Sequence, residues 1–485
     1  MTKNNSTKVL FAASEAEPFY KVGGLGDYAG SLPNALKNYF KQSGENLDIR
    51  VVLPLHDRET IPAYQLQKLF SLVIDGKENK NKCDIYETKY DNIQYYFIRQ
   101  VSPKLEFDAV YGHDQYLSAY KFALFSMAAI KMLEKLDWKP DIIHTNDWHT
   151  ALMNHLIKKE NKSSHRHTRT ILTIHNMPFM GYGSEPLLEE FRIETDRIST
   201  FPTWARNLPL PMGIAASDSI VAVSPSYAKE LTTNDFAYGL EKYFIAHPEK
   251  LNGIINGIDY QKWDPKSDTE IFQQFSKSNL GLRKINKKEL YKEIGFEIGT
   301  NEPLLVVISR LDNQKGIDLI LDTLTKTAEW NWKAVILGSG HHGYEYAFRA
   351  LERVLPNKIH AALEYNPSFA KKLYAAGDMI LMPSLYEPCG LSQMIAMRYG
   401  CVPIAHAVGG LKDSIVTKPE SKRTGFLFKP ATDEAFIASL KKAIQKYSQK
   451  DAWELIQRNG MKKDFSWLNS AANYANIYKY LLLLK

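Results

Sequence analysis

Cysteine is rare in this sequence: three occur among 485 residues, at positions 83, 389 and 401. Their spacing fits neither a disulfide framework nor a zinc site, and so few cysteines are typical of a protein from a reducing compartment. No apolar run approaches the ~18 residues that a membrane-spanning helix needs. Internal repeats and low-complexity segments are also missing, so repeat and fibrous architectures are excluded.

A strong excess of one charge is missing as well: there are 61 Lys and Arg residues and 54 Asp and Glu residues, a mild positive excess for this length. No basic stripe with interleaved aromatic residues stands out, and we therefore expect no nucleic-acid partner. The opening residues, MTKNNSTK, contain neither the apolar core of a signal peptide nor a long Ser- and Arg-rich transit segment. Together with the scarce cysteines, this predicts a cytoplasmic protein that has no membrane partner.

The length and the hydrophobic content predict a large folded protein. A chain of 485 residues is too long for one core, so two large domains are expected. A hydrophobic content of 44% and a charged content of 24% are typical of soluble globular proteins.

The most informative stretch runs from residue 379 to residue 410. Residues 379–382 (MILM) form a short apolar run, as expected of a parallel strand that is buried on both faces. Pro383 ends this strand because proline has no N–H for the sheet. A helical pattern follows from Ser392 to Gly400, and residues 401–405 start another strand. The turn between strand and helix lies where open α/β sheets bind ligands.

The residues of this turn favour binding of an anion beside a sugar. The amides of Gly390, Leu391 and Ser392 would lie at the helix N-terminus, which attracts negative charge. Glu387 stands just before them, and a carboxylate at that place is expected to bind neutral groups such as sugar hydroxyls. Spacing alone leaves open that Glu387 is an ordinary surface carboxylate of a βα loop.

A glycine-rich loop follows the first expected strand, residues 8–13. Residues 14–18 (SEAEP) break that strand, and residues 21–27 (KVGGLGD) lead into a helix. Glycines there let a phosphate or a sugar approach the backbone closely. The glycines at 24, 26 and 30 miss the G-x-G-x-x-G spacing, and the next strand ends in Pro54 rather than in an acid. A dinucleotide-binding dehydrogenase is therefore disfavoured.

Two further strand ends carry polar clusters. Residues 141–144 (DIIH) read as a buried strand that leads to Asn146, Asp147, Trp148 and His149. Residues 309–316 (SRLDNQKG) follow the strand expected at 303–308, and they place Arg310 and Lys315 five positions apart on one turn. The planar fork of an arginine and the point charge of a lysine can converge on one diphosphate.

Other segments give weaker structural expectations. Residues 83–100 alternate like an antiparallel hairpin, and residues 215–223 read as a strand. Residues 207–213 (NLPLPMG) are expected to be a loop.

Five motifs together resemble bacterial glycogen synthases and plant starch synthases: KVGGLGD, TNDWHT, NGID, SRLDNQKG and YEPCGLSQ. The resemblance extends from Lys8 to about Trp467. It implies an α/β protein of GT-B architecture, in which two Rossmann-like domains face a central interdomain cleft. The implied domains are an acceptor-side domain at 1–262 and a donor domain at 263–465, with a C-terminal helix at 466–485 that packs back on the first domain.

The resemblance also implies roles for individual residues. Asn146 stands where the family usually has a histidine, and the segment 207–213 departs from its lysine-containing pattern. The implied catalytic residues are His149, Arg310, Lys315 and Glu387. The implied donor and nucleotide site comprises Lys21, Gly23, Gly24, Tyr365, Cys389, Gly390, Leu391 and Ser392. The implied acceptor side comprises Tyr111, Asp114 and Asn176.

The implied reaction transfers glucose from ADP-glucose to the non-reducing end of an α-1,4-glucan with retention of configuration. ADP-glucose and the glucan are then the partners, and no cofactor or metal is expected, because cationic side chains take the place of a metal. Two alternatives stay open. One is a retaining transferase that uses UDP-glucose and another acceptor, and the other is a catalytically silent glucan-binding scaffold.

Overall fold

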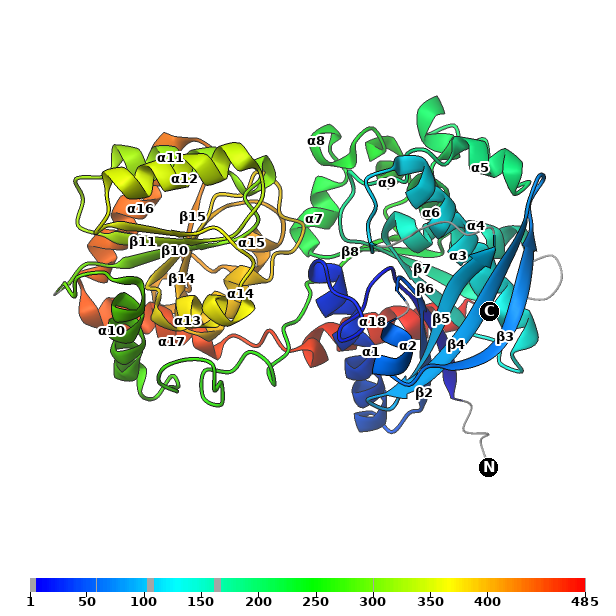
Figure 1. Ribbon diagram of the computed structural model, residues 1–485, viewed down its shortest axis with the longest axis horizontal. Coiled ribbons are helices and arrows are strands. Elements are labelled where there is room, and N and C mark those ends of the chain that lie inside the picture. Colours follow the sequence, from blue (N-terminus) through cyan, green and yellow to red (C-terminus); the bar gives the residue numbers. More distant parts are fainter. Residues whose placement is uncertain (1–5, 58, 103–108, 161–166, 300, 485) are drawn as a thin grey trace. The chain divides into compact units, whose positions relative to one another are not determined.

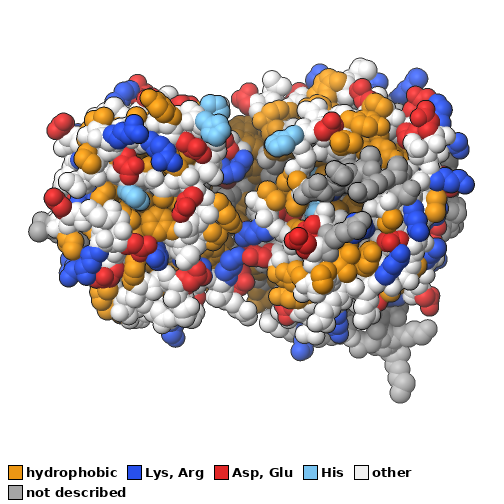
Figure 2. Space-filling model, viewed as in Figure 1, with side chains coloured by type: hydrophobic (Ala, Val, Ile, Leu, Met, Phe, Trp, Pro, Cys, Tyr) orange, Lys and Arg blue, Asp and Glu red, His pale blue; other side chains and the backbone are white. Residues whose placement is uncertain are grey.

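The computed structural model describes residues 6–57, 59–102, 109–160, 167–299 and 301–484. The chain divides into two compact units. Unit 1 comprises Met1–Gly257 together with Trp467–Lys485, and unit 2 comprises Ile258–Ser466. Among the described helices, none has both the length and the apolar content that crossing a bilayer requires. Lys, Arg, Asp and Glu side chains are interspersed over the visible surface rather than sorted by sign (Figure 2).

Unit 1 is built on a nine-stranded sheet with the order β3-β4-β5-β2-β1-β6-β7-β8-β9 (Figure 1). The strands from β5 to β9 in this order pair in parallel, whereas β3, β4 and β5 pair antiparallel at one edge. The strands are β1 (Thr7–Ala12), β2 (Leu47–Pro54), β3 (Gln67–Asp75), β4 (Lys80–Tyr90), β5 (Ile93–Ser102), β6 (Ile142–Asn146), β7 (Arg169–Ile174), β8 (Ser219–Ala222) and β9 (Leu251–Gly253).

Helices cover both faces of this sheet. Two of them begin with a side-chain cap, in which Asp114 accepts from the Leu117 N–H and Ser224 accepts from the Tyr227 N–H. The helices are α1 (Gly24–Gln42), α2 (Thr60–Ala63), α3 (Gln115–Lys135), α4 (Asp147–Glu160), α5 (Glu185–Glu190), the 3₁₀ helix η1 (Thr203–Asn207), α6 (Pro209–Ala216), α7 (Pro225–Glu230), α8 (Asn234–Ala237), α9 (Glu241–Ala246) and α18 (Trp467–Leu483).

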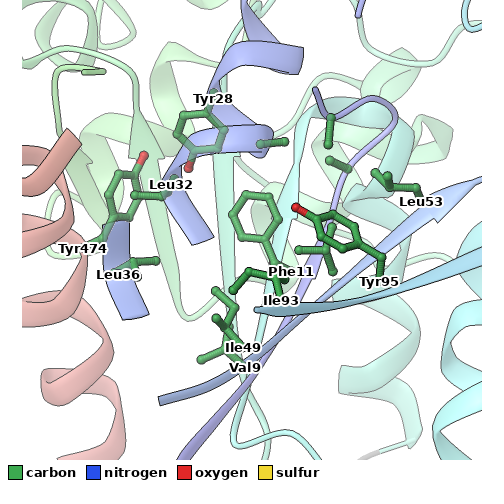
Figure 3. Close-up of a cluster of buried hydrophobic side chains, with 14 of the residues drawn as sticks. Val9, Phe11, Tyr28, Leu32, Leu36, Ile49, Leu53, Ile93, Tyr95 and Tyr474 are labelled. Atoms are coloured by element: carbon green, nitrogen blue, oxygen red, sulfur yellow. The ribbon is translucent and has the colours of Figure 1, made fainter. Parts of the chain in front are cut away.

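The alternation of side chains along β1 explains the two cores of unit 1. Val9 and Phe11 belong to one buried cluster together with Tyr28 of α1 and Tyr474 of α18 (Figure 3). Leu10 and Ala12 belong to a second cluster with residues of α3. Because successive side chains of a strand point to opposite faces, a continuous apolar run fills a core on each side.

Unit 2 contains a wholly parallel six-stranded sheet with the order β12-β11-β10-β13-β14-β15. Its strands are β10 (Leu304–Ile308), β11 (Lys333–Leu337), β12 (Ile359–Ala362), β13 (Met379–Met382), β14 (Val402–His406) and β15 (Phe426–Phe428). Its helices are η2 (Leu280–Leu282), α10 (Arg283–Ile294), η3 (Asn313–Lys315), α11 (Ile317–Lys326), α12 (His342–Val354), α13 (Pro367–Ala376), α14 (Ser392–Arg398), α15 (Gly409–Ser414), η4 (Glu420–Lys422), α16 (Asp433–Tyr447) and α17 (Lys450–Lys462).

Two sequence expectations in unit 1 are wrong in detail. Residues 207–213 are not a loop, because α6 begins at Pro209 and all of its residues are buried. Proline is tolerated in the first turn of a helix, where its missing N–H would have had no partner. The expected strand at 215–223 is shorter for the same reason, since Ala215 and Ala216 end α6 and β8 begins only at Ser219. The hairpin expected at 83–100 is confirmed as β4 and β5.

Candidate active site

In unit 2, two loops at the carboxyl edge of the sheet lie against each other. One follows β10 and the other follows β13, and these strands are parallel neighbours. The Leu385 N–H donates to the Gln314 carbonyl at 2.9 Å, and the Gln314 Nε2 donates to the Tyr386 carbonyl at 3.0 Å. The predicted diphosphate loop and the predicted sugar turn therefore form one structure.

Lys315 and Glu387 form an ion pair at the centre of this structure. The Lys315 Nζ lies 2.6 Å from the Glu387 Oε2, and the two side chains are 19% and 8% exposed. Arg310 is exposed instead, and it pairs with Asp312 at 3.0 Å. The sequence predicts separate tasks for Lys315 and Glu387, whereas the structure brings their charges into contact.

The turn after Glu387 is held by its neighbours in the fold. The Gln393 Nε2 donates to the carbonyls of Cys389 at 3.0 Å and Gly390 at 2.9 Å. The Gly410 N–H donates to the Glu387 carbonyl at 3.1 Å. Gly390 has a φ of +71°, a conformation that glycine adopts without strain. The turn is therefore fixed by a glutamine on one side and by a glycine on the other.

This turn leads directly into α14. Leu391 is the N-cap residue and Ser392 is the first helical residue. Within the described residues, the amides of Gly390, Leu391 and Ser392 donate to no other group. Tyr365, in the loop after β12, is 80% exposed and thus open to stacking.

In unit 1, His149 lies buried in the first turn of α4 among aromatic rings. Its ring centroid lies 5.0 Å from that of Tyr111, 4.6 Å from that of Phe122 and 4.4 Å from that of Trp148. Burial, with a smaller effect of Lys121, holds the pKa of His149 well below its usual value, so the imidazole is neutral. Its Nδ1 has no partner in the part of the chain that the structure describes. A neutral imidazole with a free nitrogen can accept or donate one hydrogen bond.

Asp147 fixes the neighbouring strand end. Its Oδ1 accepts from the N–H of His175 at 2.7 Å and from that of Asn176 at 3.3 Å. Burial raises the pKa of Asp147 to about 7. Asn146 stands at the position where the resemblance leads one to expect a histidine. Its Nδ2 donates to the Ala12 carbonyl at 3.0 Å, and its Oδ1 lies 3.0 Å from the His175 Nε2, with which it forms a hydrogen bond. The Asn176 amide oxygen is buried without a partner among the described residues.

Glu15 lies just after the carboxyl end of β1, and no motif of the sequence predicted a role for it. Its buried Oε2 accepts from the N–H of Val22, and from that of Gly23 at 3.2 Å. Its Oε1 accepts from the Tyr111 hydroxyl at 2.9 Å. The carboxylate thus connects the glycine-rich loop to the expected acceptor side. The only sequence signal was the position of Glu15 just after the first strand.

The remaining predicted residues of unit 1 lie around this connection. Gly23 is the N-cap residue of α1, and Gly24 is its first residue. The Lys21 Nζ pairs with Asp27 at 2.5 Å and lies 3.6 Å from Glu17. Asp114 caps α3, so its carboxylate is already engaged by the Leu117 N–H at 2.9 Å.

Comparison with known proteins identifies the family. A family model described as "Starch synthase catalytic domain" matches residues 8–246, and one described as "Glycosyl transferases group 1" matches residues 292–459. The glycogen synthase of Lactobacillus acidophilus is 36% identical over 98% of this chain and 100% of its own length. The glycogen synthase of Lactococcus lactis is 37% identical with the same coverage of both chains. This chain belongs to the glycogen synthase family.

Solved structures agree with this assignment. The catalytic domain of starch synthase IV from Arabidopsis thaliana, bound to ADP and acarbose, superposes with a TM-score of 0.87 at 30% identity, over 98% of this chain and 99% of that one. Sucrose-phosphate synthase from Thermosynechococcus elongatus shares the fold, with a TM-score of 0.62 at 14% identity over 99% and 100% of the two chains. The protein is a glycosyltransferase of the glycogen and starch synthase type, and the expected GT-B fold of two Rossmann-like domains is confirmed.

Replacing Glu15 with alanine should loosen the glycine-rich loop of this family member. The change leaves the Val22 and Gly23 amides without their acceptor, and because both residues are exposed the loss is the net contribution of each hydrogen bond, about 0.5–1.5 kcal/mol. We expect faster hydrogen exchange at these two amides and a lower free energy of unfolding. Glu15→Gln should lose less, because its amide oxygen still accepts. Glu45→Ala, which removes a surface partner of Lys479, is the control. Unchanged exchange at Val22 and Gly23 would contradict this role.

The buried histidines predict that acid destabilises unit 1. Burial lowers the pKa of His56, His144 and His175 to about 3, and that of His149 also lies well below 6.5. Below pH 6.5 the unfolded chain binds protons that the folded chain does not, so stability is lost as the pH falls. Asp147 and Glu15 oppose this trend, because their raised pKa values make the folded state bind protons there.

Between pH 7 and pH 5.5 the histidines of the unfolded chain are only partly protonated, and Asp147 offsets part of their uptake, so a net uptake of about one to two protons on unfolding is expected, which corresponds to roughly 1–3 kcal/mol per pH unit. The measurement is urea unfolding of the whole chain between pH 7 and pH 5.5, monitored by exchange of unit 1 amides. The variant His342→Ala, at an exposed histidine of unit 2, should leave this slope unchanged. A flat pH dependence would show that the four histidines are protonated in the folded state.

Proposed function

We propose that this enzyme transfers glucose from ADP-glucose to the non-reducing end of an α-1,4-glucan with retention of configuration. The observation that supports this most is its similarity, over nearly the whole of both chains, to a starch synthase catalytic domain that was solved with ADP bound. ADP is the group that leaves when ADP-glucose gives up its glucose. The donor-side features of unit 2 suit such a leaving group.

The main catalytic task is to stabilise the charge that builds up on the departing diphosphate. We assign this task to Arg310, Lys315 and the amides of Gly390, Leu391 and Ser392, whose N–H groups have no other acceptor among the described residues. Glu387 holds Lys315 at 2.6 Å and keeps its second oxygen for the hydroxyls of the glucose. Its negative charge also favours the cationic character that the sugar acquires in the transition state.

In unit 1 we assign the neutral His149 to a hydrogen bond with the transferred glucose. Its buried Nδ1, without a partner among the described residues, supports this role. For retention we propose a front-face reaction, in which a departing phosphate oxygen takes the proton of the attacking glucan hydroxyl. The resemblance assigns Lys21, Gly23, Gly24 and Tyr365 to the donor, and these roles stay predictions.

We further propose that the cationic side chains of unit 2 stabilise the negative charge of the diphosphate in place of a divalent metal ion. The rate of glucose transfer should then be unchanged by EDTA. A rate that falls with EDTA and returns with added Mg²⁺ would contradict this part of the proposal.

The decisive experiment is glucose transfer to glycogen from radiolabelled ADP-glucose and UDP-glucose, measured side by side with the variant Glu387→Ala. Incorporation from ADP-glucose that the variant loses, and that an α-1,4-specific glucosidase releases, is the expected result. Incorporation from UDP-glucose alone would assign the chain to the neighbouring specificity. Binding of glycogen without transfer from either donor would favour a silent scaffold.

A further inference from the structure

A buried chain of hydrogen bonds joins the C-terminal helix of unit 1 to two neighbouring strands of its sheet. At its centre stands His144, the third residue of β6. Its Nδ1 lies 2.7 Å from the hydroxyl oxygen of Tyr478 in α18, and its Nε2 lies 2.7 Å from the hydroxyl oxygen of Thr173 in β7. All three residues are fully buried. A contact between residues 334 positions apart therefore connects α18 to both strands.

This chain of hydrogen bonds lies on the face of the sheet that α1 and α18 cover. Phe11 of β1 stands in register with His144 of β6, and their ring centroids lie 4.8 Å apart. Phe11 also belongs to the core cluster that contains Tyr28 of α1 and Tyr474 of α18 (Figure 3). His144 therefore points into this core, and away from α3 on the opposite face.

A second pair of side chains joins β6 and β7 nearer to their carboxyl ends. The Asn146 Oδ1 bonds the Nε2 of His175, the residue that follows β7, at 3.0 Å. The ring of His175 packs edge-on against that of Tyr28, with centroids 4.5 Å apart. The Tyr28 hydroxyl in turn lies 3.2 Å from the Thr173 hydroxyl. The two strands are thus linked twice by side chains beneath α1 and α18.

These links end directly at residues of the candidate active site. Asp147 follows Asn146, and its Oδ1 accepts the N–H of His175 at 2.7 Å. No residue separates β6 from α4, because β6 ends at Asn146 and α4 begins at Asp147. His149 stands two residues further along, in the first turn of α4. A shift of β6 relative to β7 therefore displaces His149 as well.

The chemistry of His144 makes this chain of hydrogen bonds directional. Burial lowers the pKa of His144 to about 3, so the imidazole is neutral. A neutral imidazole donates at one nitrogen and accepts at the other, and His144 thus bonds Tyr478 and Thr173 in complementary roles. Apolar side chains would fill the same space without needing partners. A satisfied buried network instead fixes a single arrangement of the elements that it joins.

We propose that Tyr478 is a positioning residue for glucose transfer, and that its hydroxyl holds the carboxyl ends of β6 and β7 where they present Asp147 and His149. This inference rests on the function proposed above and adds to it a residue of the C-terminal helix. Tyr478 is fully buried and therefore touches no substrate. It acts on the rate only through the position of the edge that carries His149.

Removing one hydroxyl should slow the reaction without unfolding the chain. Tyr478→Phe keeps the buried ring and deletes a single oxygen atom. Thr173→Val interrupts the chain of hydrogen bonds on the other side of His144 at nearly constant volume. Misplacing a reacting group by about 1 Å costs about 10²-fold in rate, so a smaller displacement should lower kcat by roughly tenfold in either variant. KM for ADP-glucose should hardly change, because the groups of unit 2 are untouched.

Further variants of the full chain separate these hydrogen bonds from packing. Thr173→Ser keeps the hydroxyl and should retain most of the rate that Thr173→Val loses. The double variant Tyr478→Phe/Thr173→Val should be no slower than the slower single variant, because both changes interrupt one connection. Tyr95→Phe is the matched control, since Tyr95 is a buried tyrosine of the same cluster whose hydroxyl takes no part in these bonds.

The second readout is hydrogen exchange at the His175 amide, which requires neither donor nor acceptor. Asp147 holds this N–H at the edge itself, so its exchange reports local opening of the edge when the chain is far from unfolding. We expect exchange to be roughly tenfold faster in Tyr478→Phe than in Tyr95→Phe. A lower kcat together with this faster exchange would support the positioning role.

Other outcomes would overturn it. Unchanged kcat in both Tyr478→Phe and Thr173→Val, even in a less stable chain, would restrict these hydrogen bonds to a structural role. A lower kcat with unchanged exchange at the His175 amide, or an equal loss of rate in Tyr95→Phe, would also refute the proposal.

The exchange measurement keeps this inference separable from the function itself. If the unchanged chain transfers no glucose from ADP-glucose, the proposed function fails. Faster exchange at the His175 amide in Tyr478→Phe would then still support the hold of Tyr478 on this edge, and unchanged exchange would still refute it.

Discussion

Alanine in place of Lys315 is expected to lower kcat for glucose transfer by about 10²–10³-fold, the loss that follows removal of one preorganised donor to a developing negative charge. Lys315 is held 2.6 Å from Glu387, with a side chain that is 19% exposed. It therefore needs little reorganisation when charge moves onto the diphosphate. The measurement is kcat with saturating ADP-glucose and glycogen.

The same substitution should also destabilise unit 2, and the two effects can be separated. Lys315→Ala leaves the Glu387 carboxylate, only 8% exposed, without its cation, and breaking a buried pair costs about 3–5 kcal/mol. The double variant Lys315→Ala/Glu387→Gln no longer buries an unpaired charge. It should recover most of the lost stability and none of the lost rate.

Lys326→Ala is the matched control for this prediction. Lys326 also forms an ion pair in unit 2, with Asp433, but its side chain is 56% exposed. Exposed pairs contribute about 0–1 kcal/mol, so this variant should keep both its rate and its stability. A Lys315→Ala variant with a rate within threefold of the unchanged chain would refute the role assigned to Lys315.

The sequence predicted the strands of unit 2 almost to the residue. The strand expected at 379–382 coincides with β13, and the strand expected at 303–308 coincides with β10 to within one residue. Both are short apolar runs bounded by residues that break the pattern. A parallel sheet buried on both faces gives the clearest sequence signal.

The main error in unit 1 is at residues 207–213, which were expected to be a loop. Pro209 and Pro211 of this segment stand in the first turn of α6, which is buried throughout. Hydrophobic alternation also missed β3, whose Gln67–Asp75 segment is largely exposed at the sheet edge. Both errors arise where tertiary packing, rather than local pattern, decides the structure.

Contacts between residues distant in sequence decided what could be predicted of the candidate site. The residue types were recognisable, because Lys315 and Glu387 stand in loops at strand ends. The 2.6 Å contact between Lys315 and Glu387 could not be predicted, because no periodicity of the sequence relates two loops that are 72 residues apart. Glu15 was missed for a related reason: its importance lies in contacts with Val22, Gly23 and Tyr111 that only the folded chain creates.

The glycine pair at 409 and 410 gives the second large prediction, that Gly410→Ala disables the donor turn. A Cβ at Gly410 would lie 2.0 Å from the Cys389 carbonyl oxygen and 2.5 Å from the Cys389 Cα. Both atoms belong to the backbone, so no side chain can move aside. The turn that carries Glu387 must then shift, and misplacing a reacting group by about 1 Å costs about 10²-fold in rate.

We therefore expect Gly410→Ala to lower kcat by at least about 10²-fold, and to lower the stability of unit 2 by about 1–3 kcal/mol, the usual cost of overpacking. Gly281→Ala in the same unit is the control, because a Cβ there has nothing within 4 Å. Unchanged unfolding cooperativity in Gly410→Ala, together with faster exchange of the amide at position 410, which donates to the Glu387 carbonyl, would show that the turn and not the overall fold is affected. Full activity in Gly410→Ala would mean that the position of this turn does not limit glucose transfer.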